Sequence, residues 1–174
     1  MESQISDEGQ IPGSSSAPLA SELADSWTVA ALAHASIAVT LLLSFSGGVG
    51  ALVGPAIALA IYFGYRQRSR FVAYHALQAV AYQAIGLVMY LVLIAVLVSV
   101  TVVAWTISGL LSTVLIGLLL MPLALALTLF MVLILLLAPL GWAGYGLYVA
   151  YQVYQGRDEA YWLVGEWVGK GVES

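Results

Sequence analysis

Apolar residues fill two long stretches of the chain that contain no Asp, Glu, Lys or Arg. The first covers the 40 residues from Ser26 to Tyr65, and the second covers the 86 residues from Phe71 to Gly156. A run of about 20 apolar residues is long enough to cross the hydrocarbon layer of a bilayer as a helix. The pattern therefore predicts an all-α, polytopic membrane protein.

The first stretch divides at a cluster of glycines. Trp27 to Ser46 is long enough for one crossing, Gly47 to Gly50 favours a tight turn, and Ala51 to Tyr65 forms a shorter return leg. Pro55 falls in the first turn of that return leg, where its missing N–H is tolerated. We therefore expect an N-terminal helical hairpin.

The second stretch would extend about 130 Å as a continuous helix, which is roughly four hydrocarbon layers. We predict one long helix from Phe71 to Ala104 and another from Met121 to Gln155, with Trp105 to Leu120 forming a turn and a short interfacial or re-entrant piece. Pro139 is expected to kink the long last helix. The total is about four transmembrane helices. The alternative is six, with turns near Pro122 and Pro139.

The two ends of the chain differ from this apolar middle. Residues 1–25 are rich in Ser, Ala and acids, which is typical of a disordered tail. Residues 26–156 form the helical transmembrane domain. Residues 157–174 place aromatic and aliphatic side chains among acids, which predicts an amphipathic tail along the membrane surface. The alternative is a polar tail with incidental aromatics.

Positive charge is concentrated at one point between the apolar stretches. Arg66, Arg68 and Arg70 occupy alternate positions, and the cost of burying an Arg in hydrocarbon fixes this loop at an aqueous surface. The positive-inside rule then predicts a multi-pass protein of the cell (inner) membrane. Its N-terminus, arginine loop and C-terminus are expected in the cytoplasm.

Composition agrees with a membrane protein and excludes several other classes. The chain is 62% hydrophobic and 8% charged, whereas soluble domains have about 25% charged residues. No basic patch is present that could follow a nucleic-acid backbone, so no nucleic-acid partner is expected. The chain has no cysteine, which excludes disulfides, thiolate metal sites and thiol nucleophiles. The segment before the first apolar run lacks the basic residues of a signal peptide.

A few polar residues within the apolar stretches are candidates for chemistry. His75, Gln78 and Tyr82 share one helical face, and Tyr148 and Gln152 belong to a similar stripe on the last helix with Tyr145 and Gln155. The stripes are expected to face each other near the cytoplasmic surface. They form either interhelical hydrogen bonds beside an aromatic belt or a polar cavity for a ligand.

His34 is the ionisable residue of the first hairpin, and intramembrane ionisable residues are often functional. A neutral imidazole bonded to a neighbouring helix is the structural alternative. His34 and His75 do not suffice for a metal site, because no acid or cysteine within the spans completes it. Buried carboxylates, which proton-coupled carriers and intramembrane aspartyl proteases require, are absent from the spans. No catalytic residue, metal or cofactor is therefore assigned.

The order of these features resembles a family of small bacterial membrane proteins of unknown function. That family is related to the magnetosome protein MamF and, distantly, to the twenty-kilodalton component of the chloroplast inner-envelope translocon. The residues that carry the resemblance are Trp27, His34, Ser36, Gly50, Gly54, Pro55, Phe71, His75, Ala76, Leu77, Gln78, Tyr82, Gln83, Ala150, Gly156 and Tyr161. The stretch from Met89 to Pro139 is longer than the family usually carries, and the closing Tyr-Pro is missing.

Without a buried catalytic group, we expect a non-enzymatic scaffold or assembly protein that acts by helix packing. Its partners would be the lipid bilayer, other membrane proteins or a second copy of itself. The alternative is a channel or translocon-like transport component, which the distant part of the resemblance implies.

Overall fold

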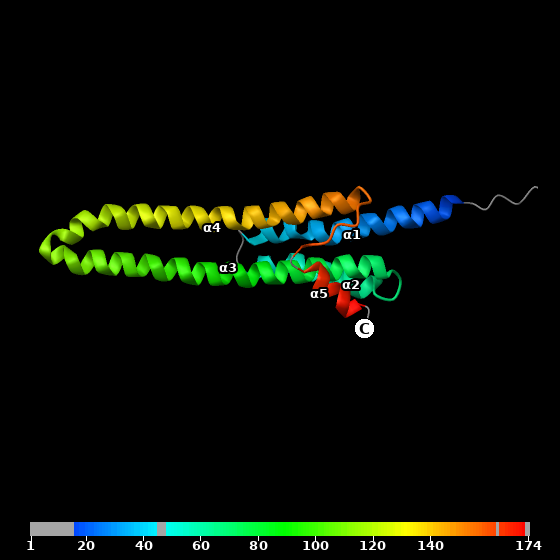
Figure 1. The fold of residues 1–174 in the computed structure, drawn as a ribbon, viewed down its shortest axis with the longest axis horizontal. Coiled ribbons are helices and arrows are strands. Elements are labelled where there is room, and N and C mark those ends of the chain that lie inside the picture. Colours follow the sequence, from blue (N-terminus) through cyan, green and yellow to red (C-terminus); the bar gives the residue numbers. More distant parts are fainter. Residues whose placement is uncertain (1–15, 45–47, 163, 173–174) are drawn as a thin grey trace, which may run out of the picture.

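The computed structural model describes residues 16–44, 48–162 and 164–172, which form helices with no strand among them (Figure 1). The helices are α1 (Ser16–Ser44), η1 (Gly48–Leu52), α2 (Val53–Tyr65), α3 (Arg70–Leu111), η2 (Ser112–Val114), α4 (Ile116–Tyr154) and α5 (Gly165–Val172). Four segments are long and apolar enough to cross a membrane, namely Glu22–Ser44, Gly48–Tyr65, Arg70–Val114 and Ile116–Tyr154. The predicted fold class, all-α with four spanning helices, is confirmed.

The α1–α2 hairpin packs against one end of the longer α3–α4 hairpin, and together they form a four-helix bundle (Figure 1). Where α1, α2 and α3 meet, the buried side chains are alanines: Ala33, Ala58, Ala76 and Ala79. Small residues let helix backbones approach closely, which is how apolar helices gain packing energy in lipid. The bundle therefore depends on close helix contact more than on large side chains.

Helices α3 and α4 continue well beyond the end of α1. Thr40 of α1 bonds Gln83 of α3, and α1 ends four residues later at Ser44. From that level α3 continues for about 24 residues, or roughly 36 Å. We call this projecting part of the α3–α4 hairpin, residues 88–140, the extension. No other helix of the described chain lies beside it in Figure 1.

The turn of the α3–α4 hairpin is shorter than the sequence suggested. The predicted turn does lie within Trp105–Leu120, but the interfacial or re-entrant piece expected there is wrong, because α3 runs to Leu111 and α4 begins at Ile116. The hydroxyls of Thr106 and Ser108 bond the carbonyls four residues before them, so these polar residues remain inside the helix. The short connection leaves Leu115 with a positive φ of 65°.

Two further expectations differ from the structure. Pro122 and Pro139 both lie inside α4, so the six-span alternative, which places turns there, is not observed. Helix α1 begins at Ser16, so residues 16–25 of the predicted disordered tail are helical, while residues 1–15 lie outside the described chain. Pro18 falls in the first turn of α1, where a missing backbone N–H costs little.

Candidate functional site

Four polar side chains form a continuous chain of contacts through the bundle. His34 Nδ1 lies 3.1 Å from the hydroxyl of Tyr161, and His34 Nε2 lies 3.0 Å from His75 Nδ1. His75 Nε2 in turn lies 3.2 Å from Oδ1 of Asp158. We call Tyr161, His34, His75 and Asp158 the relay. It joins α1, α3 and the segment after α4.

The relay satisfies its members when both imidazoles are neutral and carry their proton on Nε2. Tyr161 then donates to His34 Nδ1, and His34 Nε2 donates to His75 Nδ1. The N–H of His75 Nε2 faces the Asp158 carboxylate, although this contact lacks the alignment of a full hydrogen bond. All donors then point in one direction, from Tyr161 toward Asp158.

One end of the relay is buried and the other meets water. His34 and His75 are fully buried and Tyr161 is 1% exposed, whereas the Asp158 side chain is 67% exposed. Burial, together with the neighbouring Tyr82 and Tyr145 hydroxyls, raises the pKa of Tyr161 above its usual value. The phenol therefore keeps its proton at neutral pH.

The segment after α4 is held against the bundle by buried polar groups. We call it the C-terminal strap (residues 157–162 and 164–172). The backbone N–H of Tyr161 donates to Gln78 Oε1 at 3.2 Å, and the Tyr74 hydroxyl donates to the carbonyl of Gly165 at 3.2 Å. Val164 and Val168 of the strap are buried, whereas Trp162 is 80% exposed and Trp167 is 82% exposed.

The strap thus has a buried face and an exposed aromatic face. The sequence predicted its amphipathic character, and its placement along a membrane surface stays a prediction. What the sequence did not indicate is that Tyr161 enters the centre of the bundle. The strap is therefore part of the packed structure at the end of the molecule where α2 meets α3 (Figure 1).

Three aromatic rings are stacked beside the relay. Tyr82 lies between Tyr161, at a centroid distance of 3.9 Å and 3° between planes, and Trp142, at 4.4 Å and 6°. The Tyr82 hydroxyl donates to the carbonyl of Trp142 at 2.8 Å. A side chain at Gly86 would collide with the Trp142 indole, so this glycine makes room for the stack. The rings form an ordered column from the relay to α4.

A second polar cluster lies deeper in the bundle. Gln83 Nε2 donates to the hydroxyl of Ser36 at 2.9 Å, and Thr40 donates to Gln83 Oε1 at 2.8 Å. Gly54 of α2 lies directly against these groups, where any side chain would collide with them. Ser36 and Thr40 share a face of α1 at a spacing of four residues, a signal that the sequence carried but that we did not use.

The structure brings together part of the predicted polar face. His75, Gln78 and Tyr82 are all buried and all contact Tyr161 or its partners. Tyr148 and Gln152 do not join them. The Gln152 amide donates to the Tyr148 hydroxyl at 2.9 Å, and Tyr148 is half-exposed on the outside of α4.

Tyr145 is the member of the α4 stripe that faces Tyr82, with ring centroids 5.9 Å apart. Asp158 and Tyr161 were missed as site residues. They follow the last span by sequence, and no spacing rule connects them to histidines about 83 and 127 residues away.

The arginine residues lie at one end of the bundle. Arg66, Arg68 and Arg70 are exposed in and beside the connection from α2 to α3, and the guanidinium of Arg66 lies 5.2 Å above the Phe63 ring. Ser69 caps α3 by accepting from the backbone N–H of Val72 at 3.3 Å. Because α3 and α4 are antiparallel, the C-terminal end of α4 lies at this same end (Figure 1), and Arg157 follows α4 by three residues.

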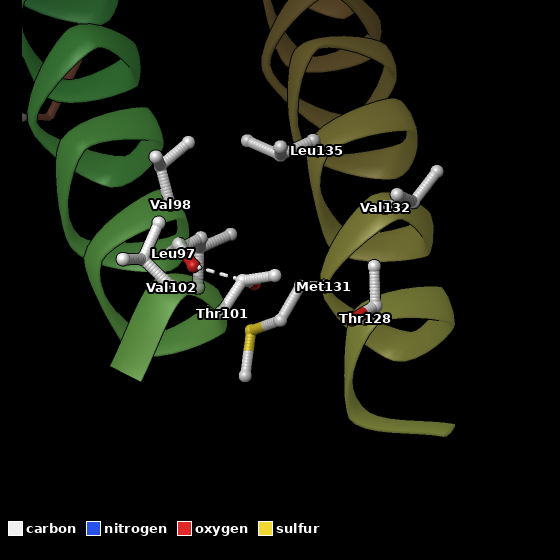
Figure 2. Close-up of a pocket in the computed structure, with 8 residues that line it drawn as sticks. All are labelled: Leu97, Val98, Thr101, Val102, Thr128, Met131, Val132 and Leu135. Atoms are coloured by element: carbon white, nitrogen blue, oxygen red, sulfur yellow. Dashed lines mark hydrogen bonds between the residues drawn. The ribbon is translucent and has the colours of Figure 1, made fainter. Parts of the chain in front are cut away.

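An open groove of about 190 Å³ lies in the extension, between α3 and α4 (Figure 2). Its lining is apolar apart from two threonine hydroxyls. The residues are Leu97, Val98, Thr101, Val102, Thr128, Met131, Val132 and Leu135. Thr101 donates to the carbonyl of Leu97, and Thr128 donates to the carbonyl of Ala124 while it accepts from the Trp105 indole N–H, so both hydroxyl protons already have a partner.

The described residues contain no group of three His, Cys, Asp or Glu side chains that could hold a metal ion. The chemistry that the arrangement does offer is proton movement along the relay and contact between stacked rings. No protein-family model, curated protein or solved structure matches this chain.

Proposed function

We propose that the protein is a non-enzymatic scaffold or assembly protein of the cell membrane that acts by helix packing through its extension. The observation that carries this proposal is the length and surface of the α3–α4 hairpin. Helix α3 has 42 residues and α4 has 39, and both are uncharged beyond Arg70. Large apolar side chains such as Val88, Leu119 and Phe130 are exposed along the extension.

This hairpin is too long for a single bilayer. Forty-two helical residues extend about 63 Å, twice the roughly 30 Å hydrocarbon layer. At a tilt of about 40°, the upper end of the usual range, the helix still spans about 48 Å. Part of the apolar surface is left outside the hydrocarbon. Large exposed apolar patches are typical of protein interaction sites. Packing against another membrane protein or a second copy would cover it.

The relay supports a structural role for the buried polar groups. Its histidines and Tyr161 bond one another, and the groove in the extension lies elsewhere in the molecule. Interhelical hydrogen bonds of this kind stabilise helix association by about 0.6 kcal/mol each on average. They would hold the α1–α2 hairpin and the strap on α3–α4, and thereby present the extension.

The proposal includes an orientation. The arginine loop and Arg157 lie at one end of the bundle, and the positive-inside rule favours the cytoplasm for that end. The extension would then point away from the cytoplasm. The resemblance to the family related to MamF is retained as part of this proposal for the fold alone, because the function of that family is unknown.

Crosslinking tests the proposal directly, because the chain contains no native cysteine. The variant Leu119→Cys places a thiol on the extension, where the native side chain is 80% exposed. Oxidation in native membranes would reveal a second copy as a disulfide-linked dimer. A photoreactive group attached to the same thiol would capture a different neighbouring protein.

The matched control is Leu42→Cys, on α1, where the native leucine is 70% exposed. We expect adducts from Leu119→Cys at a yield several-fold above that of the control. Equal yields at both positions, or no adduct at Leu119→Cys, would contradict an interaction surface on the extension.

A further inference from the structure

The relay begins at a phenol and ends at an exposed carboxylate, and it has a single direction. A chain whose donors all point from Tyr161 to Asp158 is arranged to deliver the Tyr161 proton to water. Acid–base chemistry does not use this path near neutral pH, because burial keeps the Tyr161 phenol protonated. Removal of an electron does use it, since an oxidised phenol is a strong acid.

The aromatic column supplies the matching path for the electron. Tyr161 is stacked on Tyr82 at 3.9 Å, and Tyr82 is stacked on Trp142 at 4.4 Å. Trp142 is only partly buried, and it lies in the segment Ile116–Tyr154, which is long and apolar enough to cross a membrane. Proton and electron therefore have separate exits, the first to water through Asp158 and the second toward lipid through Trp142.

We propose that Tyr161 is a redox-active tyrosine that gives one electron to a one-electron oxidant of the membrane, a lipid peroxyl radical, while its proton leaves through the relay. This activity goes beyond the scaffold function and needs no substrate cavity. Both paths are built from residues of α1, α3, α4 and the strap, so they exist only in the folded bundle.

The step balances in atoms and charge. The O–H bond of Tyr161 breaks and its proton passes to His34 Nδ1, while the proton on His34 Nε2 passes to His75 Nδ1. The proton on His75 Nε2 passes to the Asp158 carboxylate and from there to water. The electron reaches the peroxyl radical, which takes one proton from water and becomes a lipid hydroperoxide. Tyr161 is left as a neutral radical, and both imidazoles have changed tautomer.

The test uses the full chain in detergent micelles and photogenerated tris(bipyridine)ruthenium(III) as the oxidant. Samples are frozen during illumination, and electron paramagnetic resonance measures the yield of tyrosyl radical. We expect Tyr161→Phe to lower the yield several-fold. The matched control is Tyr151→Phe, which removes a tyrosine that is 58% exposed on α4 and should leave the yield nearly unchanged.

Two further variants address the paths separately. Trp142→Phe shortens the aromatic column without touching the relay, and it should slow oxidation of Tyr161. His34→Gln removes the base that receives the phenol proton, and it should shorten the radical lifetime. Circular dichroism and gel filtration identify any variant that fails to fold, and the remaining variant then decides.

Liposomes of polyunsaturated phosphatidylcholine test the lipid oxidant itself. The wild-type protein should lengthen the lag before oxygen uptake after addition of a radical initiator, and Tyr161→Phe should abolish that effect. A radical yield or lag that is the same in wild type and Tyr161→Phe would overturn the proposal. The crosslinking of Leu119→Cys does not depend on Tyr161, so the scaffold proposal stands or fails separately.

Discussion

At the residue scale, most of the buried polar groups in this bundle are placed where they find a hydrogen-bond partner. An unpaired polar group in an apolar interior costs several kcal/mol, so histidine, glutamine and tyrosine persist there only when hydrogen-bonded. His34 uses both ring nitrogens, and Gln83 uses both ends of its amide. Among the described residues, three buried side-chain nitrogens have no hydrogen-bond partner, namely Gln78 Nε2, His75 Nε2 and Trp142 Nε1.

Two glycines of α2 provide a matched test of the deeper polar cluster. A Cβ added at Gly54 would lie 2.6 Å from Gln83 Oε1 and from the carbonyl of Ser36, whereas Gly64 has nothing within 4 Å. We expect Gly54→Ala to lower the free energy of unfolding by about 1–3 kcal/mol through overpacking. Gly64→Ala should raise it by up to about 1 kcal/mol, because alanine favours a helix.

The measurement is unfolding of the purified protein by sodium dodecyl sulfate titration, followed by circular dichroism. A Gly54→Ala variant as stable as wild type would mean that α2 does not lie against Gln83 as described. Both variants replace glycine by alanine in the same helix, so the gain in helix propensity is similar in both. The difference between their unfolding free energies therefore measures the overpacking at Gly54.

Sequence reasoning reached part of this site. His75, Gln78 and Tyr82 were predicted to share a face because their spacing of three and four residues fixes their direction on a helix. Tyr148 was assigned to the facing stripe, yet it lies outside, since the rotation of α4 depends on its packing against α1 and α3. Asp158 and Tyr161 are placed by tertiary contacts, which no periodic pattern records.

At the element scale, the C-terminal strap connects helices that do not follow one another in the chain. It is joined to α4 through Gly156, which has a φ of 78°, a conformation that glycine adopts without strain. The strap buries Tyr161, Val164 and Val168 and is bonded to residues of α1 and α3. Its docking therefore couples helices that are distant in the sequence.

Docking of the strap should weaken at alkaline pH. The pKa of the docked Tyr161 is raised, and the pKa of the detached phenol is about 10, so the stabilisation is complete below pH 10 and decreases as the pH rises above it. The slope should approach about 1.4 kcal/mol per pH unit. The mobility of a spin label at Trp162→Cys would report detachment.

The control adds Tyr161→Phe to the labelled protein and should remove the pH dependence while weakening docking at every pH. An equal slope in both proteins would assign the transition to other tyrosines. The prediction concerns the strap alone, because the helices of the bundle need not separate when it detaches.

Helix boundaries were predictable where they depend on charge and glycine, and less so elsewhere. The arginine loop between α2 and α3 was located because charged residues are excluded from hydrocarbon. The tip of the α3–α4 hairpin was located only to within Trp105–Leu120, and the ends of α3 and α4 there were not predicted. Thr106 and Ser108 bond their own helix backbone, so residues that suggested a turn continue α3 to Leu111.

At the scale of the whole molecule, the charged residues next to the two long helices lie at one end. Arg70 begins α3, and Arg157 follows α4. The connection from α2 to α3 and the strap occupy one end, η1 lies part of the way along, and the tip of the α3–α4 hairpin lies at the other end (Figure 1). Because α3 and α4 are antiparallel, Arg70 at the start of α3 and Arg157 after the end of α4 lie at the same end of the molecule.

Thiol labelling of intact cells tests the proposed orientation. Arg68→Cys and Gln155→Cys should react with a membrane-impermeant maleimide only after permeabilisation. Val49→Cys lies in η1, where the extension begins, at a valine that is 81% exposed, and it should react in intact cells. The reverse pattern would invert the orientation, and labelling of all three from one side would contradict a bundle that crosses the membrane.

The contact between His34 and Tyr161 also has a consequence for synthesis. The two residues are separated by 127 positions in the chain. At about 5–20 residues per second, a ribosome completes Tyr161 roughly 6–25 seconds after His34. During that interval His34 Nδ1 lacks the Tyr161 hydroxyl, and His34 Nε2 lacks its partner until His75, 41 positions along the chain, has been made. Maturation of the bundle should therefore finish after translation has passed the last span, and a nascent chain stalled before Tyr161 should be more accessible to membrane-bound proteases than the finished protein.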